Sequence, residues 1–293
     1  MINKLRIIIV GGAGFVGLNI AKFFLKNNYN VTIIDKTKIH LNFKNLKYIN
    51  CDIESIEKIQ RVIEKDDIIF YFADIADINE AKLKPMLTIR QNILNLSTFL
   101  DSIKHKKIKR FIYGSSLYVY SSCGSIYRAT KQSAEILIET FSDLYNLNFT
   151  FVRFGSLYGR GSQSWNGMNK FISQVINKGY IEYSGNGKEV REYINIDDAA
   201  RMSAEIALDK NFNNKAVCLS AQQSITVDQL FTLIFEIFGK KKKVKYLNKK
   251  NLDDHYGFTP YRYYPKPSTK IISNSMKDLG EGILETISEI KKN

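Results

Sequence analysis

Residues 6–17 read Arg-Ile-Ile-Ile-Val-Gly-Gly-Ala-Gly-Phe-Val-Gly, and this stretch decides the fold. An unbroken apolar run from Ile7 to Val10 leads into the glycines, and an amphipathic pattern continues from Leu18 to Leu25. An apolar run, a glycine cluster and a helical period in this order predict a buried strand, a tight turn and the start of a helix.

Three glycines of this turn have the spacing of a dinucleotide-binding turn. Gly11 would let the chain turn sharply off the strand, Gly14 would let the backbone approach a pyrophosphate, and Gly17 would let the helix pack closely on the sheet. The phosphates would lie on free N–H groups at the positive end of the helix, so Phe15 and Val16 are also candidate cofactor contacts. The alternative is a glycine-rich turn that binds no ligand.

The next apolar segment, Val31 to Ile34, ends on an acidic residue that bears on the choice of cofactor. Asp35 lies 18 positions after Gly17, about where a carboxylate accepts the hydroxyls of the adenosine ribose. Such a carboxylate repels a 2′-phosphate, which favours NAD over NADP. Lys36 and Lys38 could weaken that repulsion, so NADP stays open.

Composition is typical of a globular protein with a large core. The chain has 293 residues, 44% of them hydrophobic, which fits one large domain or two intimate ones. No stretch reaches the roughly 18 apolar residues of a membrane span, and the first residues lack a signal-peptide pattern, so we expect a cytoplasmic protein without membrane insertion. Three scattered cysteines and three histidines predict neither a disulfide framework nor a metal site.

The net charge of +14 makes a nucleic-acid partner one interpretation to weigh. The densest basic run, within residues 240–250, follows an apolar helical pattern at 230–238. Neither aromatic interleaving nor a known binding motif accompanies this run, so we interpret it as a solvated connection and expect no nucleic acid.

Strands and helices alternate through the first half of the chain. We expect strands at 47–50, 67–72, 110–113 and 150–154, and helices at 54–64, 85–106 and 127–145. This alternation predicts an α/β fold with a Rossmann-type doubly wound parallel sheet, whose ligands bind at the carboxyl ends of the strands. We predict a dinucleotide-binding domain over residues 1–160 and a smaller C-terminal α/β substrate-binding region over residues 161–293, with some segments returning to the Rossmann sheet.

Three side chains form a candidate catalytic set. Ser116 ends a predicted strand, and Tyr127 and Lys131 lie one turn apart on one face of the following helix. A tyrosine phenol is protonated at neutral pH, and a neighbouring ammonium favours its phenolate form. With the serine hydroxyl, this pair can move a proton from an alcohol while a nicotinamide takes the hydride. Such pairs are common on helix surfaces, and it is the nucleotide-binding start of the chain that favours catalysis.

Further motifs follow in order. They are Asp52-Ile53, Ser116-Leu-Tyr-Val-Tyr120, Tyr127-Arg-Ala-Thr-Lys131, Arg153-Phe-Gly-Ser-Leu-Tyr-Gly159 and Gly185-Asn-Gly-Lys-Glu-Val-Arg-Glu-Tyr-Ile-Asn-Ile-Asp-Asp198. With the glycine turn and Asp35, they extend over nearly the whole chain. In this combination the chain resembles the extended short-chain dehydrogenase/reductases of the NAD-dependent epimerase/dehydratase family, which act on nucleotide sugars.

The resemblance implies a role for each matched residue. Tyr127 would be the acid/base, Lys131 would orient Tyr127 and the nicotinamide ribose, and Ser116 would hold the sugar oxygen. Further candidate cofactor contacts are Asp52 and Ile53, beside the adenine, and Phe72 and Ala73.

Two arginines are candidates for the substrate diphosphate. In the family, the arginine that matches Arg191 grips this group, and Arg262 is our candidate for a second one. The alternative for Arg191 is a surface ion pair with Glu189 or Glu192.

The chain departs from the family around the sugar. Only ten residues separate Ser116 from Tyr127, where the family has a longer loop, so the sugar stays open. Leu117-Tyr118 replace the Asp-Glu pair of the family's dehydratases, which disfavours dehydration. Cys123 could act as an extra base in epimerisation beside a ketone, but we interpret it as a loop filler because free cysteines are usually inert.

The leading hypothesis is an NAD-dependent nucleoside-diphosphate-sugar epimerase acting at carbon 4. A nucleotide-sugar 4-ketoreductase or dehydrogenase with the same site is the alternative, and a non-catalytic dinucleotide- or RNA-binding relative is the third hypothesis. Family members often dimerise through the helix before Arg110 and the helix that carries Lys131. The wide apolar stripe of residues 86–103 agrees, so we expect a homodimer.

Overall fold

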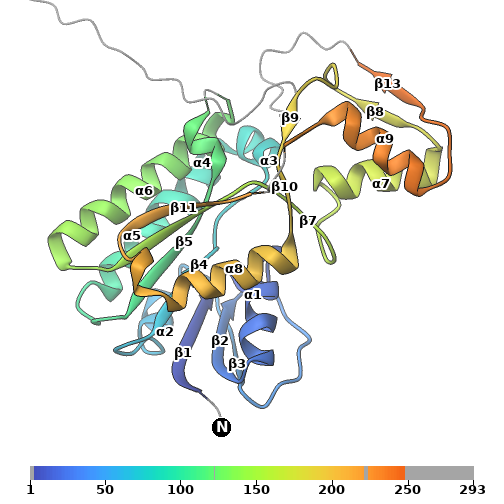
Figure 1. Ribbon diagram of the computed structural model, residues 1–293. Helices are drawn as coiled ribbons and strands as arrows, with labels where there is room; N and C mark the ends of the chain where they lie inside the picture. Colours follow the sequence, from blue (N-terminus) through green and yellow to red (C-terminus); the bar gives the residue numbers. More distant parts are fainter. Residues whose placement is uncertain (1–2, 122, 221–223, 248–293) are drawn as a thin grey trace, which may run out of the picture. The chain divides into compact units, whose positions relative to one another are not determined.

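The computed structural model describes residues 3–121, 123–220 and 224–247. In this part of the chain, seven parallel strands form one sheet in the order β11-β6-β5-β4-β1-β2-β3 (Figure 1). The strands are β1 (Asn3–Val10), β2 (Tyr29–Asp35), β3 (Leu46–Asn50), β4 (Ile68–Tyr71), β5 (Arg110–Ser116), β6 (Phe149–Phe154) and β11 (Lys215–Leu219). The strand order reverses between β1 and β4, where ligands bind in doubly wound sheets. The Rossmann-type fold predicted from the sequence is confirmed.

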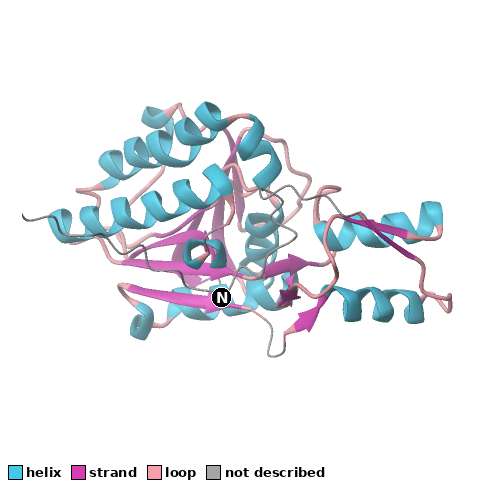
Figure 2. Ribbon diagram, turned by 90° about the horizontal axis from the view of Figure 1, so that it is seen from above, coloured by secondary structure: helices cyan, strands magenta, loops and turns pink. Residues whose placement is uncertain are grey.

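Strand β1 shows how the core is divided between the two faces of the sheet. Ile8 and Val10 belong to one buried cluster, whereas Ile7 and Ile9 belong to another, because successive side chains of a strand point to opposite faces. Helices α2 (Ile56–Gln60), α5 (Asn95–Ile103) and α6 (Ser125–Tyr145) cover the first face, and α1 (Phe15–Lys26) and α8 (Ile196–Leu208) cover the second (Figure 2). None of the helices in the described ranges is long and apolar enough to span a bilayer.

A smaller part of the chain has a core of its own. Helices α7 (Gly167–Lys178) and α9 (Val227–Ile237) pack with strands β8 (Ile181–Tyr183) and β13 (Val244–Tyr246) around buried Phe171, Val175 and Phe231. Strands β7 (Ser156–Tyr158) and β10 (Tyr193–Asn195) pair beside it, as do β9 (Val190–Arg191) and β12 (Ile225–Thr226). Between these segments, α8 and β11 return to the main sheet.

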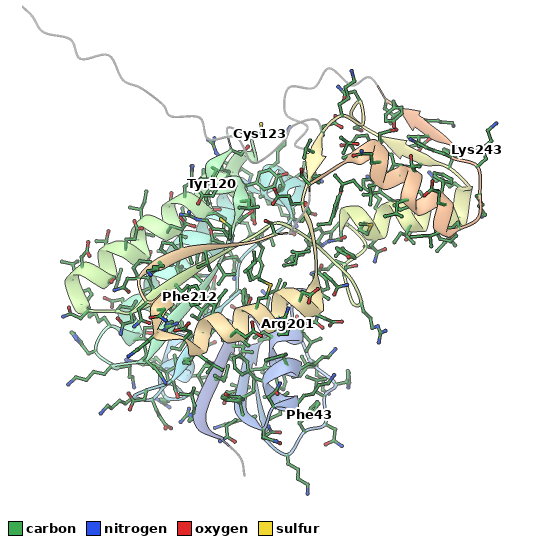
Figure 3. The ribbon with its side chains drawn as sticks, in the orientation of Figure 1. Phe43, Tyr120, Cys123, Arg201, Phe212 and Lys243 are labelled. Carbon is green, nitrogen blue, oxygen red and sulfur yellow. The ribbon has the colours of Figure 1, made fainter. Side chains whose placement is uncertain are left out.

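The described part of the basic run, residues 240–247, differs in part from the solvated connection that the sequence suggested, and Lys249 and Lys250 lie outside the described residues. Lys243 is exposed (Figure 3), but Lys242 donates to the Asp228 carboxylate at 2.6 Å and to Thr232 at 3.0 Å. Lys245 lies 4.2 Å from the ring centre of Tyr180. Part of this positive charge therefore holds β13 to the smaller core.

The helical stretch predicted at 85–106 is confirmed over 85–103, but it is not one regular α-helix. The chain forms α4 (Pro85–Ile89), a π-helical segment (Arg90–Leu94) and then α5. Buried Asn92, within the π-helical segment, accepts from Ile75 N at 2.8 Å and donates to Ile75 O and Thr130. These bonds tie the wide π-helical turn to the loop after β4. Short π-helical turns often lie at functional sites.

Two other helices differ from the prediction. The helix predicted at 54–64 ends at Gln60, because the backbone beyond it is used elsewhere: Arg6 donates to Val62 O, and Glu64 N donates to Asp67. Helix α3 (Ile78–Leu83) was not predicted. It begins at the Asp77 cap, whose carboxylate accepts from Asn79 N at 2.9 Å.

Candidate active site

The glycine turn gives each of its three predicted glycines a different environment. A Cβ on Gly11, whose φ is +77°, would lie 2.5 Å from Ala73 N, and a Cβ on Gly17 would lie 2.8 Å from Gly11 O. A Cβ on Gly14 would contact only Gly11 O, at 3.4 Å, and would otherwise enter open space. Gly14 is the N-cap residue of α1 and has no side chain that could accept from the first N–H groups of the helix. The helix N-terminus and the backbone at Gly14 therefore face a cavity that a side chain would narrow.

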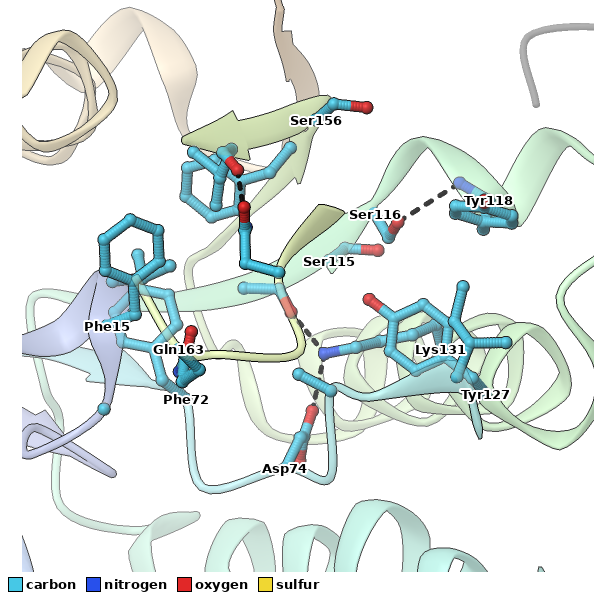
Figure 4. A pocket seen from close by; sticks show the side chains of 18 of the residues that line it. Phe15, Phe72, Asp74, Ser115, Ser116, Tyr118, Tyr127, Lys131, Ser156 and Gln163 are labelled. Atoms are coloured by element: carbon cyan, nitrogen blue, oxygen red, sulfur yellow. Dashed lines mark hydrogen bonds and ion pairs between the residues drawn. The ribbon is translucent and has the colours of Figure 1, made fainter. Parts of the chain in front are cut away.

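Ser116, Tyr127 and Lys131 line one cavity beside this turn, with a volume of about 300 Å³ (Figure 4). Ser116 comes from the end of β5, whereas the tyrosine and the lysine come from the first turns of α6. Gly14, Phe15, Val16 and Gly17 line the same cavity. The tertiary structure thus brings together the catalytic candidates and the glycine turn.

A second cavity, of about 390 Å³, shares part of this lining and extends toward the ends of β2 and β3. It is lined by Asp35, Lys36, Asp52, Ile53, Ala73 and others, together with Gly11, Gly14, Phe72 and Asp74 from the region shared with the first cavity. All residues predicted beside the adenosine therefore meet in one place.

Charges around Asp35 bear on the cofactor. The Asp35 carboxylate accepts from Ala13 N at 2.9 Å and from Thr37 N at 2.8 Å, which fixes its direction. Lys36 Nζ lies 3.2 Å from Asp52 Oδ2. The bond from Glu54 N and the nearby Lys36 ammonium lower the pKa of Asp52, although partial burial opposes them. Lys36 is thus paired with Asp52.

Arg191 lies in a third cavity, of about 160 Å³, which adjoins the first. Ser156, Trp165 and Asn166 line both cavities. Arg191 is buried and donates to Val190 O at 2.9 Å, while Glu189 accepts from Asn186 N. Arg262, the second predicted arginine, lies outside the described residues.

Two adjacent serines end β5 and line the first cavity, and their hydroxyls have different partners. Ser115 donates to Glu135 at 2.5 Å. Ser116 Oγ accepts from Tyr118 N at 3.2 Å and caps the 3-10 turn Leu117–Tyr120, so its own hydroxyl proton can be directed into the cavity. The choice of Ser116 over Ser115 is consistent with this geometry.

Cys123 is half-buried and is not among the described residues that line the three cavities (Figure 3). Its backbone N–H donates to Ser121 Oγ at 2.9 Å. This position agrees with a loop residue and gives the extra-base alternative no support. The described residues also contain no group of three His, Cys, Asp or Glu side chains that could hold a metal ion.

Sequence reasoning missed Asp74, three residues after β4. Lys131 Nζ donates to Asp74 Oδ2 at 2.7 Å and to Gly114 O at 2.5 Å, and Tyr113 OH donates to the same Asp74 oxygen at 2.7 Å. Burial lowers the pKa of Lys131, but the Asp74 carboxylate and the Tyr127 phenol more than offset this, so the pKa is raised. The ammonium lies 5.9 Å from the Tyr127 ring centre. The available signal was an acidic residue at the carboxyl end of a central strand.

Comparison with known proteins identifies a matching family. The sequence profile of the NAD dependent epimerase/dehydratase family matches residues 7–217. The chain is 25% identical over 270 residues to the UDP-glucuronate 4-epimerase of Thermodesulfobacterium geofontis, which covers 82% of this chain and 83% of the relative.

Solved structures show the same fold. The UDP-N-acetylglucosamine 4-epimerase of Methanobrevibacter ruminantium, in complex with UDP-N-acetylmuramic acid, superposes with a TM-score of 0.78 at 23% identity, covering 88% of this chain and 89% of that one. The UDP-glucuronic acid 4-epimerase of Bacillus cereus, in complex with UDP-glucuronic acid and NAD, has a TM-score of 0.76 at 21% identity, covering 89% and 90%. Because the family profile extends over most of the sequence, the chain belongs to the NAD-dependent epimerase/dehydratase family.

Proposed function

We propose that this chain is an NAD-dependent epimerase of nucleoside-diphosphate sugars that acts at carbon 4. The observation that carries the proposal is the meeting of Ser116, Tyr127 and Lys131 in one cavity beside the glycine turn. The relative and the two solved structures named above are 4-epimerases of UDP-sugars by name, and one of these structures holds NAD.

The residues of the two larger cavities fit a dinucleotide. The open backbone at Gly14 and the start of α1 suit a pyrophosphate, and Asp35 suits ribose hydroxyls. Because Lys36 is paired with Asp52, its ammonium offsets less of the repulsion between the Asp35 carboxylate and a 2′-phosphate, which supports NAD. When bound, NAD accepts a hydride from the sugar and returns it.

The chain's own residues would move the proton. Tyr127, in its phenolate form, takes the proton of the sugar hydroxyl, and the Lys131 ammonium stabilises that phenolate. Ser116 donates a hydrogen bond to the same sugar oxygen. After the ketosugar has turned over in the cavity, Tyr127 would return the proton to the same oxygen.

The lining of the first cavity favours epimerisation over dehydration. Leu117 and Tyr118 follow the catalytic serine, where a dehydratase needs acidic groups. Asp74 is the single carboxylate among the described residues that line this cavity, and it is held by Lys131 and Tyr113. Among the described residues of this cavity, no acid is therefore placed to expel water from the sugar.

The third cavity would hold the nucleotide end of the substrate. Arg191 offers a permanent positive charge for the diphosphate, and Trp165, Tyr183 and Tyr193 offer apolar surface for a base. Arg262 is proposed as a second diphosphate contact on the sequence pattern alone.

A homodimer belongs to this proposal. Five exposed apolar side chains lie on the segment 85–103 and on α6: Met86 (73% exposed), Leu87 (46%), Leu94 (56%), Ile136 (63%) and Leu144 (65%). The α4 and α6 helices also contact each other within the chain (Figure 1). Pairing these helices with those of a second copy would remove this apolar surface from water.

The test is a thermal-shift screen of UDP-, GDP-, CDP- and dTDP-sugars with NAD and NADP, since a ligand that binds the native state raises the melting temperature. Stabilising sugars are then followed by NMR without added reductant. Inversion at carbon 4 is expected. Stoichiometric consumption of NAD(P)H without inversion would identify the 4-ketoreductase alternative, and no response to any nucleotide sugar would support the non-catalytic relative.

A further inference from the structure

Asp74 has a buried oxygen that the proposed chemistry does not use. Its side chain is 3% exposed, and Oδ2 accepts from both Lys131 and Tyr113 at 2.7 Å. Oδ1 is buried, and no described residue donates to it. A buried carboxylate oxygen without a donor is costly, and native proteins usually supply a partner for such a group, either a ligand or water.

The position of Asp74 indicates which ligand group could be that partner. Asp74 belongs to the lining shared by the first two cavities, between Asp35 on one side and Tyr127 on the other. A dinucleotide bound between these ends would bring its pyrophosphate and its nicotinamide-side ribose near the residues that both cavities share. Phosphate oxygens at neutral pH do not donate to a carboxylate, whereas ribose hydroxyls do.

We propose that Asp74 is a positioning and cofactor-binding residue, which holds the Lys131 ammonium with Oδ2 and accepts a hydroxyl of the nicotinamide-side ribose with Oδ1. This inference rests on the proposed NAD-dependent function. Lys131 donates two of its three N–H groups to Asp74 and Gly114, which leaves one for the ligand or for Tyr127. Asp74 would thus set the direction of the Lys131 side chain and would itself contact the ribose.

An internal water is the competing partner for Oδ1. The hydroxyl of Tyr71, on β4, is also buried, and no described residue bonds to it. A water molecule shared by Tyr71 and Asp74 would satisfy both groups without any cofactor. The experiment must therefore detect the ribose hydroxyl itself.

Calorimetric titration with NAD and with NAD analogues that lack the 2′- or the 3′-hydroxyl of the nicotinamide ribose provides this test. In the wild type, loss of the contacted hydroxyl should weaken binding about tenfold, as expected for a hydrogen bond to a charged group. The Asp74→Ala variant should bind NAD about tenfold more weakly and should no longer distinguish NAD from that analogue. If the alanine variant does not fold, Asp74→Asn replaces it in the test because asparagine keeps the shape of the side chain. The difference between its affinities for NAD and for the analogue should be smaller than in the wild type, because the charge is lost.

The matched control is Asp67→Asn. Asp67 is a buried aspartate paired with Arg6, and it precedes β4 at the end remote from the glycine turn. This variant should discriminate between NAD and the analogues as the wild type does. Discrimination that is unchanged in both Asp74 variants would overturn the inference in favour of internal water. Failure of the wild type to bind NAD would instead reject the proposed function, so the two failures are distinguishable.

Discussion

Arg153 and Glu135 form a bidentate ion pair, in which Nε donates to Oε1 at 2.9 Å and Nη2 donates to Oε2 at 2.5 Å. The pair joins β6 to α6 one turn beyond Lys131, and Ser115 donates to the same carboxylate. Arg153 also donates to the Tyr120 hydroxyl. This network holds the helix that carries Tyr127 and Lys131 against the end of β5.

Removal of Glu135 should destabilise the protein. Glu135→Ala removes the counter-ion of the Arg153 guanidinium, which is largely buried, so the free energy of unfolding should fall by about 3 to 5 kcal/mol. Urea denaturation measures this change. The control is Glu139→Ala, which removes an exposed carboxylate one turn further along the same helix and should change stability by less than about 0.5 kcal/mol. Equal effects of the two variants would contradict the role of the pair.

Tyr127 should be required for the chemical step. Tyr127→Phe removes the hydroxyl that exchanges the proton, so turnover of an accepted nucleotide sugar should fall by about 100- to 10,000-fold. Tyr145→Phe makes the same change at the far end of α6 and should leave turnover unaltered. Steady-state kinetics and the thermal shift with substrate separate lost chemistry from lost binding. Full turnover by the Tyr127 variant would remove the catalytic assignment.

Replacement of Gly11 by alanine and replacement of Gly14 by alanine should have different effects on stability and on NAD binding. Gly11→Ala should destabilise the fold by at least about 2 kcal/mol, because φ is +77° and the new Cβ would lie 2.5 Å from Ala73 N. Gly14→Ala should cost at most about 1 kcal/mol of stability but should weaken NAD binding at least tenfold (about 1.4 kcal/mol). Urea denaturation and calorimetric titration measure the two effects. Weakened NAD binding by Gly11→Ala alone, with Gly14→Ala normal, would contradict this division.

Asp67 should make stability depend on pH. Burial raises the pKa of Asp67 to about 6, although the bond from Glu64 N and the Arg6 charge oppose this. Between pH 4 and pH 6 the folded state then binds more protons than the unfolded state, so the free energy of unfolding should fall as the pH rises. One proton contributes a slope of at most about 1.4 kcal/mol per pH unit.

The difference in unfolding free energy between wild type and Asp67→Asn isolates this group. That difference should change between pH 4 and pH 6 and stay constant above pH 7. A difference that does not vary with pH would show that Asp67 titrates alike in the folded and unfolded states.

The apolar face of α6 should control assembly. Light scattering at micromolar concentration is expected to show a dimer for the wild type and a monomer for Ile136→Glu, because a charge would be buried in the interface. Ile176→Glu, on the exposed side of α7, is the matched control and should stay dimeric. A monomeric wild type would refute the homodimer.

Much of the site could be predicted because its residues follow local patterns. The run from Ile7 to Gly17 predicts a strand, a turn and a helix from neighbouring residues, and a spacing of four places Tyr127 and Lys131 on one helical face. The interruption of the helix near Asn92 could not be predicted in this way, because it depends on bonds to Ile75 and Thr130, which are distant in sequence.

By itself, the sequence determined the parallel sheet, the glycine turn and the identity of the three catalytic candidates, since hydrophobic period and residue spacing act over short distances. Only the tertiary structure decided that Asp74 holds Lys131 and that Glu135 holds Arg153. These ion pairs join different elements of the fold, and their strength depends on burial, which no local pattern specifies.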